Sequence, residues 1–164
     1  MAATPDTFES LLAEVKKTAD ATIGSIGERF DFSLASIDLL DSFVDGVDFS
    51  DDDKDTKLYD LAESIGAYIG EVVRRHGLGE WIASASEPEY KTESPLLVRT
   101  PKSIFDPFNW ALKRLVNGPE DNLLLKFDFM VLKDRDLNFR ALNKKPKKEK
   151  GFWGRFFEWP EDMI

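Results

Sequence analysis

The chain has 164 residues, of which 42% are hydrophobic, and it contains 13 Phe, 4 Trp and no cysteine. This length fits one domain with a substantial core, and the lack of cysteine excludes a disulfide framework, thiolate catalysis and zinc sites that use sulfur. The net charge of −9 disfavours a general nucleic-acid-binding protein, because an acidic body repels a phosphate backbone.

The charge is distributed unevenly. Residues 1–63 carry 16 acidic and 5 basic side chains, whereas residues 133–155 carry 9 basic and 3 acidic ones. We therefore expect a single acidic domain over residues 1–143 and a basic-aromatic tail over residues 144–164. No run of about 18 apolar residues is present to span a membrane, and the start of the chain lacks the pattern of a secretory signal, so the cytoplasm is the expected compartment.

The first predicted element is an amphipathic helix over about residues 5–25. Thr4 is the predicted N-cap and Pro5 stands at the first helical position, where its missing N–H costs nothing. Apolar side chains recur at three- and four-residue steps and form one stripe, made of Phe8, Leu11, Leu12, Val15, Ala19, Ile23 and Ile26.

A second, shorter helix is predicted from Ser33 or Leu34 to about Asp45, with Ser33 as its cap and Gly46 as its end. Its inward side is expected to carry Leu34, Ile37, Leu40, Phe43 and Val44. Its solvent side is expected to carry Asp38, Asp41 and Asp45.

An aspartate cluster follows, made of Asp48, Asp51, Asp52, Asp53 and Asp55. A calcium-binding EF-hand loop needs ligands at alternate positions, a central Gly and a Glu at the twelfth position. The central Gly is missing here, although Glu63 is twelfth counting from Asp52. We interpret the cluster as the acid-rich start of the next helix and predict no metal site and no cofactor.

The third helix, predicted over about residues 53–76, carries the clearest signal. Acidic residues crowd its start and basic residues its end, as the helix dipole favours, and Gly77 supplies the left-handed position after it. Its apolar stripe is wide enough to be buried on two sides, so we place it in the middle of the fold. Gly66 and Gly70 share one face, where a neighbouring backbone is expected to approach closely.

Two short strands are predicted at residues 80–83 and 95–99, joined by a polar loop. Two strands alone are marginal, so they must pack on helices or find a third strand. A further helix should start at Asp106-Pro107 and end at Asn117-Gly118, and another should open at residue 119. Residues 123–132 fit a helix or a strand, and the helix is favoured. The predicted fold class is α+β, mostly α, with four to five helices packed with a small antiparallel hairpin or sheet.

Taken in chain order, several of these sequence segments resemble a group of small bacterial domains of unknown function. The shared features are a glycine-bearing helix ending in Gly70-Glu71, a following Glu80-Trp81 strand, a Pro107 helix start and a Lys113-Arg114-x-x-Asn117-Gly118 helix end. Segments 36–41, 59–68 and 104–108 resemble the same group, so the similarity covers roughly residues 33–125. The resemblance implies a bacterial or phage source and a shared fold, and it implies no activity.

A polar cluster is predicted around the end of the third helix. Its members are Glu71, Arg74, Arg75, His76, Glu80 and Trp81. One interpretation is an acid–base or anion-binding site, and the other is a capped helix end with surface charges. A hydrolytic triad has little support, because there is one His and no recognisable nucleophile, so we predict no catalytic residue.

The tail is the feature that folding explains least. Five of the twenty aromatic residues fall within residues 152–159, after a lysine-rich segment. The expected contact residues are Lys147, Lys148, Phe152, Trp153, Arg155, Phe156, Phe157 and Trp159. Three interpretations remain open: contact with an anionic membrane surface, docking into a partner's groove, and burial against the parent domain or a second copy.

From these observations the expected function is a non-catalytic, cytoplasmic protein–protein interaction domain. The expected partner is another protein or a second copy of this chain, and no nucleic acid. A peripheral membrane protein anchored by the tail is the alternative, and an enzyme that uses Glu71, Arg75 and His76 is the third hypothesis.

Overall fold

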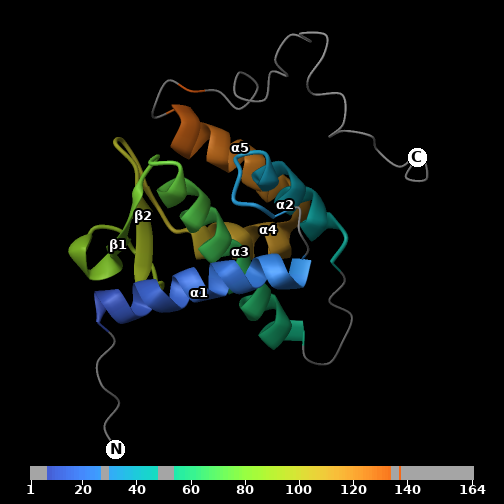
Figure 1. Ribbon diagram of the computed structural model, residues 1–164, viewed down its shortest axis with the longest axis horizontal. Helices are drawn as coiled ribbons and strands as arrows, with labels where there is room; N and C mark the ends of the chain where they lie inside the picture. The colour runs from blue at the N-terminus through green and yellow to red at the C-terminus, as the bar shows by residue number, and fades with distance from the viewer. Residues whose placement is uncertain (1–6, 27–29, 48–53, 134–136, 138–164) are drawn as a thin grey trace, which may run out of the picture.

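A computed structural model describes residues 7–26, 30–47, 54–133 and 137, and it confirms a mostly helical α+β fold (Figure 1). The helices are α1 (Phe8–Ile26), α2 (Ser36–Asp45), α3 (Lys54–Arg75), α4 (Pro107–Asn117) and α5 (Leu123–Phe127). The strands are β1 (Glu80–Ala83), β2 (Leu96–Arg99) and β3 (Ile104–Phe105).

Helix α3 occupies the middle of the fold, as predicted. It packs against α1 on one side and α4 on the other, and it also contacts β1. All nine residues from Ile65 to Val73 are buried, so this part of the helix has no solvent side. Gly77 follows with a φ of 64°, the left-handed conformation expected after the helix end.

The two glycines of α3 allow close packing, but against different groups. A Cβ on Gly66 would lie 2.7 Å from the Cα of Phe108, so a backbone approaches closely there, as predicted. A Cβ on Gly70 would lie 2.0 Å from Cζ2 of Trp81, so at this position the close neighbour is an indole ring and not a backbone. The two glycines therefore fix how α4 and β1 lie on α3.

The strands form one antiparallel sheet in the order β1-β2-β3. Trp81 pairs with Val98 in the first ladder, and Val98 pairs with Phe105 in the second. The first two strands were predicted, and β3 supplies a third strand, which was one of the two ways in which the pair was expected to be stabilised. Helices α1 and α3 both contact β1, and the middle of the sheet is buried at Trp81, Ile82 and Leu96 to Val98.

Helices α1 and α2 differ from the prediction in their N-terminal caps and in which side chains of α2 are buried. Helix α1 begins at Phe8, where Thr7 accepts a hydrogen bond from Ser10 N at 3.2 Å and so takes the capping role predicted for Thr4. Thr4 and Pro5 lie outside the described residues. Helix α2 begins at Ser36 with Ala35 at the N-cap position and no side-chain cap, and the hydrogen bond from Ser36 N to Ser33 Oγ, at 3.2 Å, closes the turn that precedes the helix.

Two side chains of α2, Phe43 and Asp41, lie on the opposite side from the one predicted. Phe43 is 37% exposed instead of inward, and Asp41, expected on the solvent side, is only 7% exposed. Asp41 is buried because Arg114 of α4, itself 2% exposed, donates from Nε to its carboxylate at 2.9 Å. Leu123 N donates to the same oxygen at 2.8 Å, which ties α2 to the start of α5.

Residues 123–132 are helical, which decides between the two predicted alternatives. Asn122 caps α5 by accepting a hydrogen bond from Leu125 N at 2.8 Å. The chain then continues as a π-helix over Asp128–Leu132. In the described ranges, the structure contains no helix that combines the length and apolar character needed to cross a bilayer.

Candidate functional site

The predicted polar cluster is centred on Glu71, which is completely buried on α3. Arg74 binds both carboxylate oxygens at 2.8 Å, Arg75 Nε donates to Oε2 at 3.2 Å, and Trp81 Nε1 donates to Oε1 at 3.0 Å. These four hydrogen bonds occupy the roughly four acceptor positions that a carboxylate offers. The interpretation as surface charges is therefore wrong for Glu71.

The electrostatics of this cluster keep Glu71 ionised. Burial alone would raise the pKa of Glu71, but the hydrogen bonds from Arg74 and Trp81 outweigh burial, and the pKa lies below its ordinary value. A carboxylate that is ionised and fully hydrogen-bonded has no position left to accept a proton from a substrate. The cluster joins α3 to β1 and is not arranged for acid–base chemistry.

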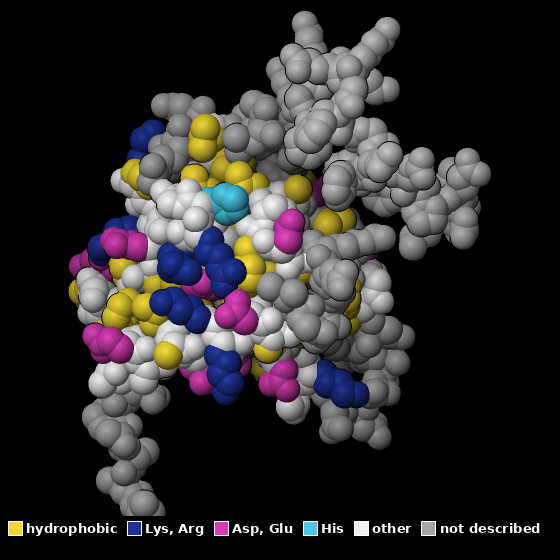
Figure 2. All heavy atoms as spheres, in the orientation of Figure 1, with side chains coloured by type: hydrophobic (Ala, Val, Ile, Leu, Met, Phe, Trp, Pro, Cys, Tyr) yellow, Lys and Arg dark blue, Asp and Glu magenta, His cyan; other side chains and the backbone are white. Residues whose placement is uncertain are grey.

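Arg75 extends the cluster toward α1 and the segment before α2. Its Nη2 donates to Oδ1 of Asp20 at 2.7 Å, and its guanidinium carbon lies 3.5 Å from the centroid of the Phe32 ring. On this face of the molecule, basic side chains gather beside the single histidine (Figure 2). Because Asp20 and Glu71 both pair with Arg75, its charge is already balanced.

Two of the six predicted members lie outside this network. His76 Nε2 donates to the carbonyl oxygen of Phe32 at 2.8 Å, and Glu80 lies 3.8 Å from Arg99. The structure therefore joins Glu71, Arg74, Arg75 and Trp81 in one network, with His76 beside it on the Phe32 carbonyl and Glu80 next to Arg99. An enzyme that combines Glu71 with His76 gains no support from this geometry.

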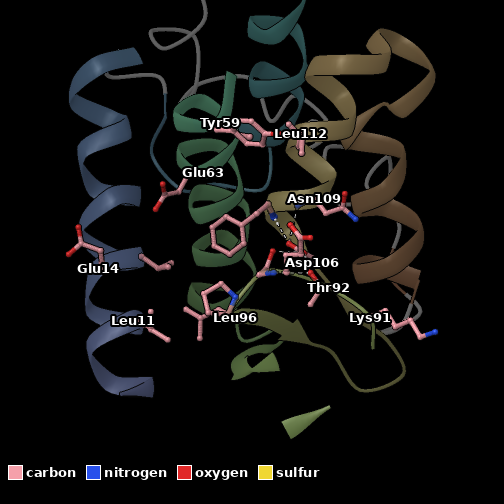
Figure 3. A pocket seen from close by; sticks show the side chains of 16 residues that line it. Leu11, Glu14, Tyr59, Glu63, Lys91, Thr92, Leu96, Asp106, Asn109 and Leu112 are labelled. Carbon is pink, nitrogen blue, oxygen red and sulfur yellow. Dashed lines mark hydrogen bonds between the residues drawn. The ribbon is translucent and has the colours of Figure 1, made fainter. Parts of the chain in front are cut away.

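A groove of about 500 Å³ lies between α1, α3, α4 and the loop that joins β1 to β2. Figure 3 shows Tyr59 and Leu112 at one end of the groove and Leu11 and Leu96 at the other. Its apolar lining is made of Leu11, Val15, Tyr59, Ala62, Pro95, Leu96, Phe108 and Leu112. Tyr59 is 62% exposed, so its ring offers a large apolar surface at the edge of the groove.

Charged side chains form the rim of this groove. Glu14, Glu63 and Glu93 line it and are exposed, and Lys91 is the basic residue of the lining. Figure 3 shows Glu14 and Glu63 on the α1 and α3 side. The rim is therefore acidic and the lining apolar, which suits a ligand that combines apolar side chains with positive charge.

Asp106 lies inside the same groove but is committed to the fold. One carboxylate oxygen accepts hydrogen bonds from Phe108 N at 2.9 Å and Asn109 N at 3.0 Å, which caps α4. The other accepts from Thr92 and Ser94 of the β1–β2 loop. Asp106 thus holds the loop against α4 and gives the groove a fixed wall.

Sequence reasoning did not find the groove, because its walls come from segments up to about a hundred residues apart in the chain. The only available signals were Tyr59 in the resembled segment and the polar β1–β2 loop. The predicted contact residues in the tail, from Lys147 to Trp159, lie outside the described residues, as do Asp48, Asp51, Asp52 and Asp53. The domain boundary predicted at residue 143 lies there as well.

Comparison of the chain with protein-family models, with curated proteins and with solved structures finds no match. The resemblance to small bacterial domains therefore stays a prediction. In the part of the chain that the structure describes, no three His, Asp or Glu side chains gather as metal ligands would.

Proposed function

We propose that this chain is a non-catalytic protein-interaction domain, and that its partner binds in the groove between α1, α3, α4 and the β1–β2 loop. The observation that carries the proposal is the exposure of Tyr59, 62%, above an apolar groove of about 500 Å³. Tyrosine is enriched among the residues that dominate binding energy, because its ring buries a large area at a low entropic cost.

The shape and rigidity of the groove support the proposal. Its walls are held by Asp106, which joins the loop to α4, and by the close contact between Gly66 and Phe108, which joins α4 to α3. A surface that is already ordered loses little entropy on binding. The groove is therefore suited to receive a segment of a partner without rearrangement.

The acidic rim indicates the chemistry of that partner. Glu14, Glu63 and Glu93 would attract lysine or arginine side chains, and the apolar lining would bury aromatic or aliphatic ones. Like charges would repel an acidic peptide or a nucleic acid. We therefore expect the partner segment to be basic and apolar.

The buried carboxylates give no support to a catalytic role. Glu71 and Asp106 each accept four hydrogen bonds, and Asp41 accepts three. In the described residues, every buried side-chain nitrogen or oxygen has a hydrogen-bond partner. A general acid or base must lie within hydrogen-bond reach of the proton it transfers, and these carboxylates direct their oxygens to partners within the fold.

The test compares two substitutions of equally exposed rings. Tyr59 in the groove is 62% exposed, and Phe129 on the π-helix is 63% exposed. Wild-type, Tyr59→Ala and Phe129→Ala chains are immobilised and incubated with native host lysate, and the retained proteins are quantified by mass spectrometry. A binding hot spot is worth about 2 kcal/mol, or roughly 30-fold in affinity.

We expect a protein that the wild type and Phe129→Ala retain equally and that Tyr59→Ala loses. Unfolding of the variants is checked by thermal melting, which neither substitution should change much, because each removes a mostly exposed ring. Equal retention by Tyr59→Ala and the wild type would contradict the proposal.

A further inference from the structure

We propose that, without a partner, the groove is occupied by the basic-aromatic segment of the same chain, residues 144–159. This inference rests on the proposed function, because it uses the same groove and adds the identity of one occupant. It also implies that a partner protein must displace this segment in order to bind.

Charge complementarity is the first support for this occupant. Residues 144–159 contain six basic and two acidic side chains. The exposed groove rim carries the three carboxylates of Glu14, Glu63 and Glu93 and the single ammonium of Lys91. Opposite charges on the segment and the rim lower the free energy of the bound state and orient the segment. A second copy of the acidic body would be repelled by the same rim.

Apolar complementarity is the second support. Residues 152–159 include five aromatic rings, which is a quarter of the aromatic residues of the chain. The groove offers an exposed ring at Tyr59 and apolar contacts from Leu11, Phe108 and Leu112. Aromatic pairs contribute about 0.5–1.5 kcal/mol beyond the area that they bury. A basic segment rich in rings is therefore the chemistry that this groove selects.

Chain length allows the segment to reach the groove within one molecule. Residues 138–151 separate the last described residue, Leu137, from the first ring of the segment. Fourteen residues span at most about 46 Å, and on a folded body roughly 36 Å across that length runs over the surface to all but the region directly opposite Leu137. Tethering gives an effective concentration in the millimolar range, which favours the same chain over a free copy.

The experiment measures where the segment lies in the full chain. The chain has no cysteine, so Glu161→Cys provides a single attachment site for a nitroxide spin label. The label broadens nearby amide resonances in a ¹⁵N-labelled sample. We expect broadening of Glu14, Tyr59, Glu63 and Leu112, and no comparable broadening of Leu125 and Phe129, which lie on α5 and the π-helix.

Two variants of the labelled full chain serve as tests of specificity. Phe152→Ser combined with Trp153→Ser removes rings from the segment, and Glu14→Lys combined with Glu63→Lys reverses charge on exposed rim positions. Each should abolish the broadening in the groove. Phe129→Ala, outside the groove, should leave it unchanged.

A mixture of spin-labelled chain without ¹⁵N and ¹⁵N-labelled chain without the nitroxide separates intramolecular from intermolecular binding. The proposal expects no broadening in the mixture. Broadening only in the mixture, broadening at another face, or no broadening at all would overturn it. Absence of broadening in the groove, together with co-sedimentation of the chain with vesicles containing phosphatidylserine, would assign the segment to a membrane surface instead.

Failure of this inference is distinguishable from failure of the proposed function. If the segment occupies the groove, Phe152→Ser with Trp153→Ser should increase the amount of partner that the immobilised chain retains, because competition is removed. If this double variant retains as much partner as the wild type, and Tyr59→Ala still loses the partner, the inference is overturned and the proposed function stands.

Discussion

The indole Nε1 of Trp81 donates a hydrogen bond to Oε1 of Glu71 at 3.0 Å, while the benzo edge of the same ring lies against Gly70. One side chain of β1 therefore satisfies a buried carboxylate of α3 and fills the space that the neighbouring glycine leaves open. The charge and the close contact are two parts of one junction between helix and sheet.

Gly70→Ala should destabilise the protein. The added Cβ would lie 2.0 Å from Cζ2 of Trp81, and moving the ring would also weaken its hydrogen bond to Glu71. Overpacking of this kind costs about 1–3 kcal/mol, which chemical denaturation will measure. Gly46→Ala is the control, because its nearest neighbour would be at 3.6 Å and it should change stability little. Equal stability of the two variants would contradict the close contact.

Glu71→Gln should change how stability depends on pH. The folded pKa of Glu71 lies below its ordinary value of 4.5, so the unfolded chain binds this proton more readily than the folded protein does. The stability that Glu71 contributes is therefore complete above its ordinary pKa and is lost as the pH falls through the lower folded pKa. Hydrogen bonds to a charged group contribute about 1.5–3 kcal/mol each at most.

Melting temperatures measured from pH 7 to pH 3 should show wild type above Glu71→Gln at neutral pH, with the gap narrowing in acid. Among the described residues, the other carboxyls with lowered pKa values are Asp31 and Asp121, and they are present in both proteins and do not affect the difference. If the two melting-temperature curves ran parallel from pH 7 to pH 3, Glu71 would not be the group whose protonation changes the stability.

Arg114→Met should unfold or strongly destabilise the protein. It would leave the buried carboxylate of Asp41 without its ion-pair partner, and breaking a buried pair costs about 3–5 kcal/mol. Asp45 also binds Arg114 but is 57% exposed, so Asp45→Ala should cost no more than about 1 kcal/mol. Urea denaturation of both variants measures the two losses of stability. Equal losses would show that Asp41 is not the main ion-pair partner of Arg114.

Calorimetric titration with calcium should show no micromolar binding to the full chain. The spacing of the aspartates between residues 48 and 55 is wrong for a single ion, because a calcium loop needs alternating ligands around a central glycine. Micromolar binding that Asp51→Ala with Asp53→Ala abolishes would overturn this prediction.

Local chemistry was enough to predict most element boundaries. Asp106 and Pro107 start α4, and Gly77 and Gly118 adopt the positive φ values that follow a helix end. These signals are readable because each depends on a few neighbouring residues. The burial of α3 was predictable for a related reason, since its wide apolar stripe leaves little surface for solvent.

Features made by distant residues could not be predicted. Asp41 looks like a solvent-side residue of an amphipathic helix, and it is buried only because Arg114 lies opposite, 73 residues later. The groove depends on how α1, α3 and α4 are arranged, which no local pattern encodes. The polar cluster was half predictable, because Glu71, Arg74 and Arg75 share one helix end, whereas the role of Trp81 depends on where β1 packs.

The burial of Ile65 to Val73 on every side also determines how this protein opens. No single neighbour can move away and leave these backbone amides accessible to water, because α1, α4 and β1 cover different sides of the helix. Their hydrogens should therefore exchange with deuterium only when the whole domain unfolds. The slowest exchange rates in α3 would report the global free energy of unfolding directly, without a denaturant.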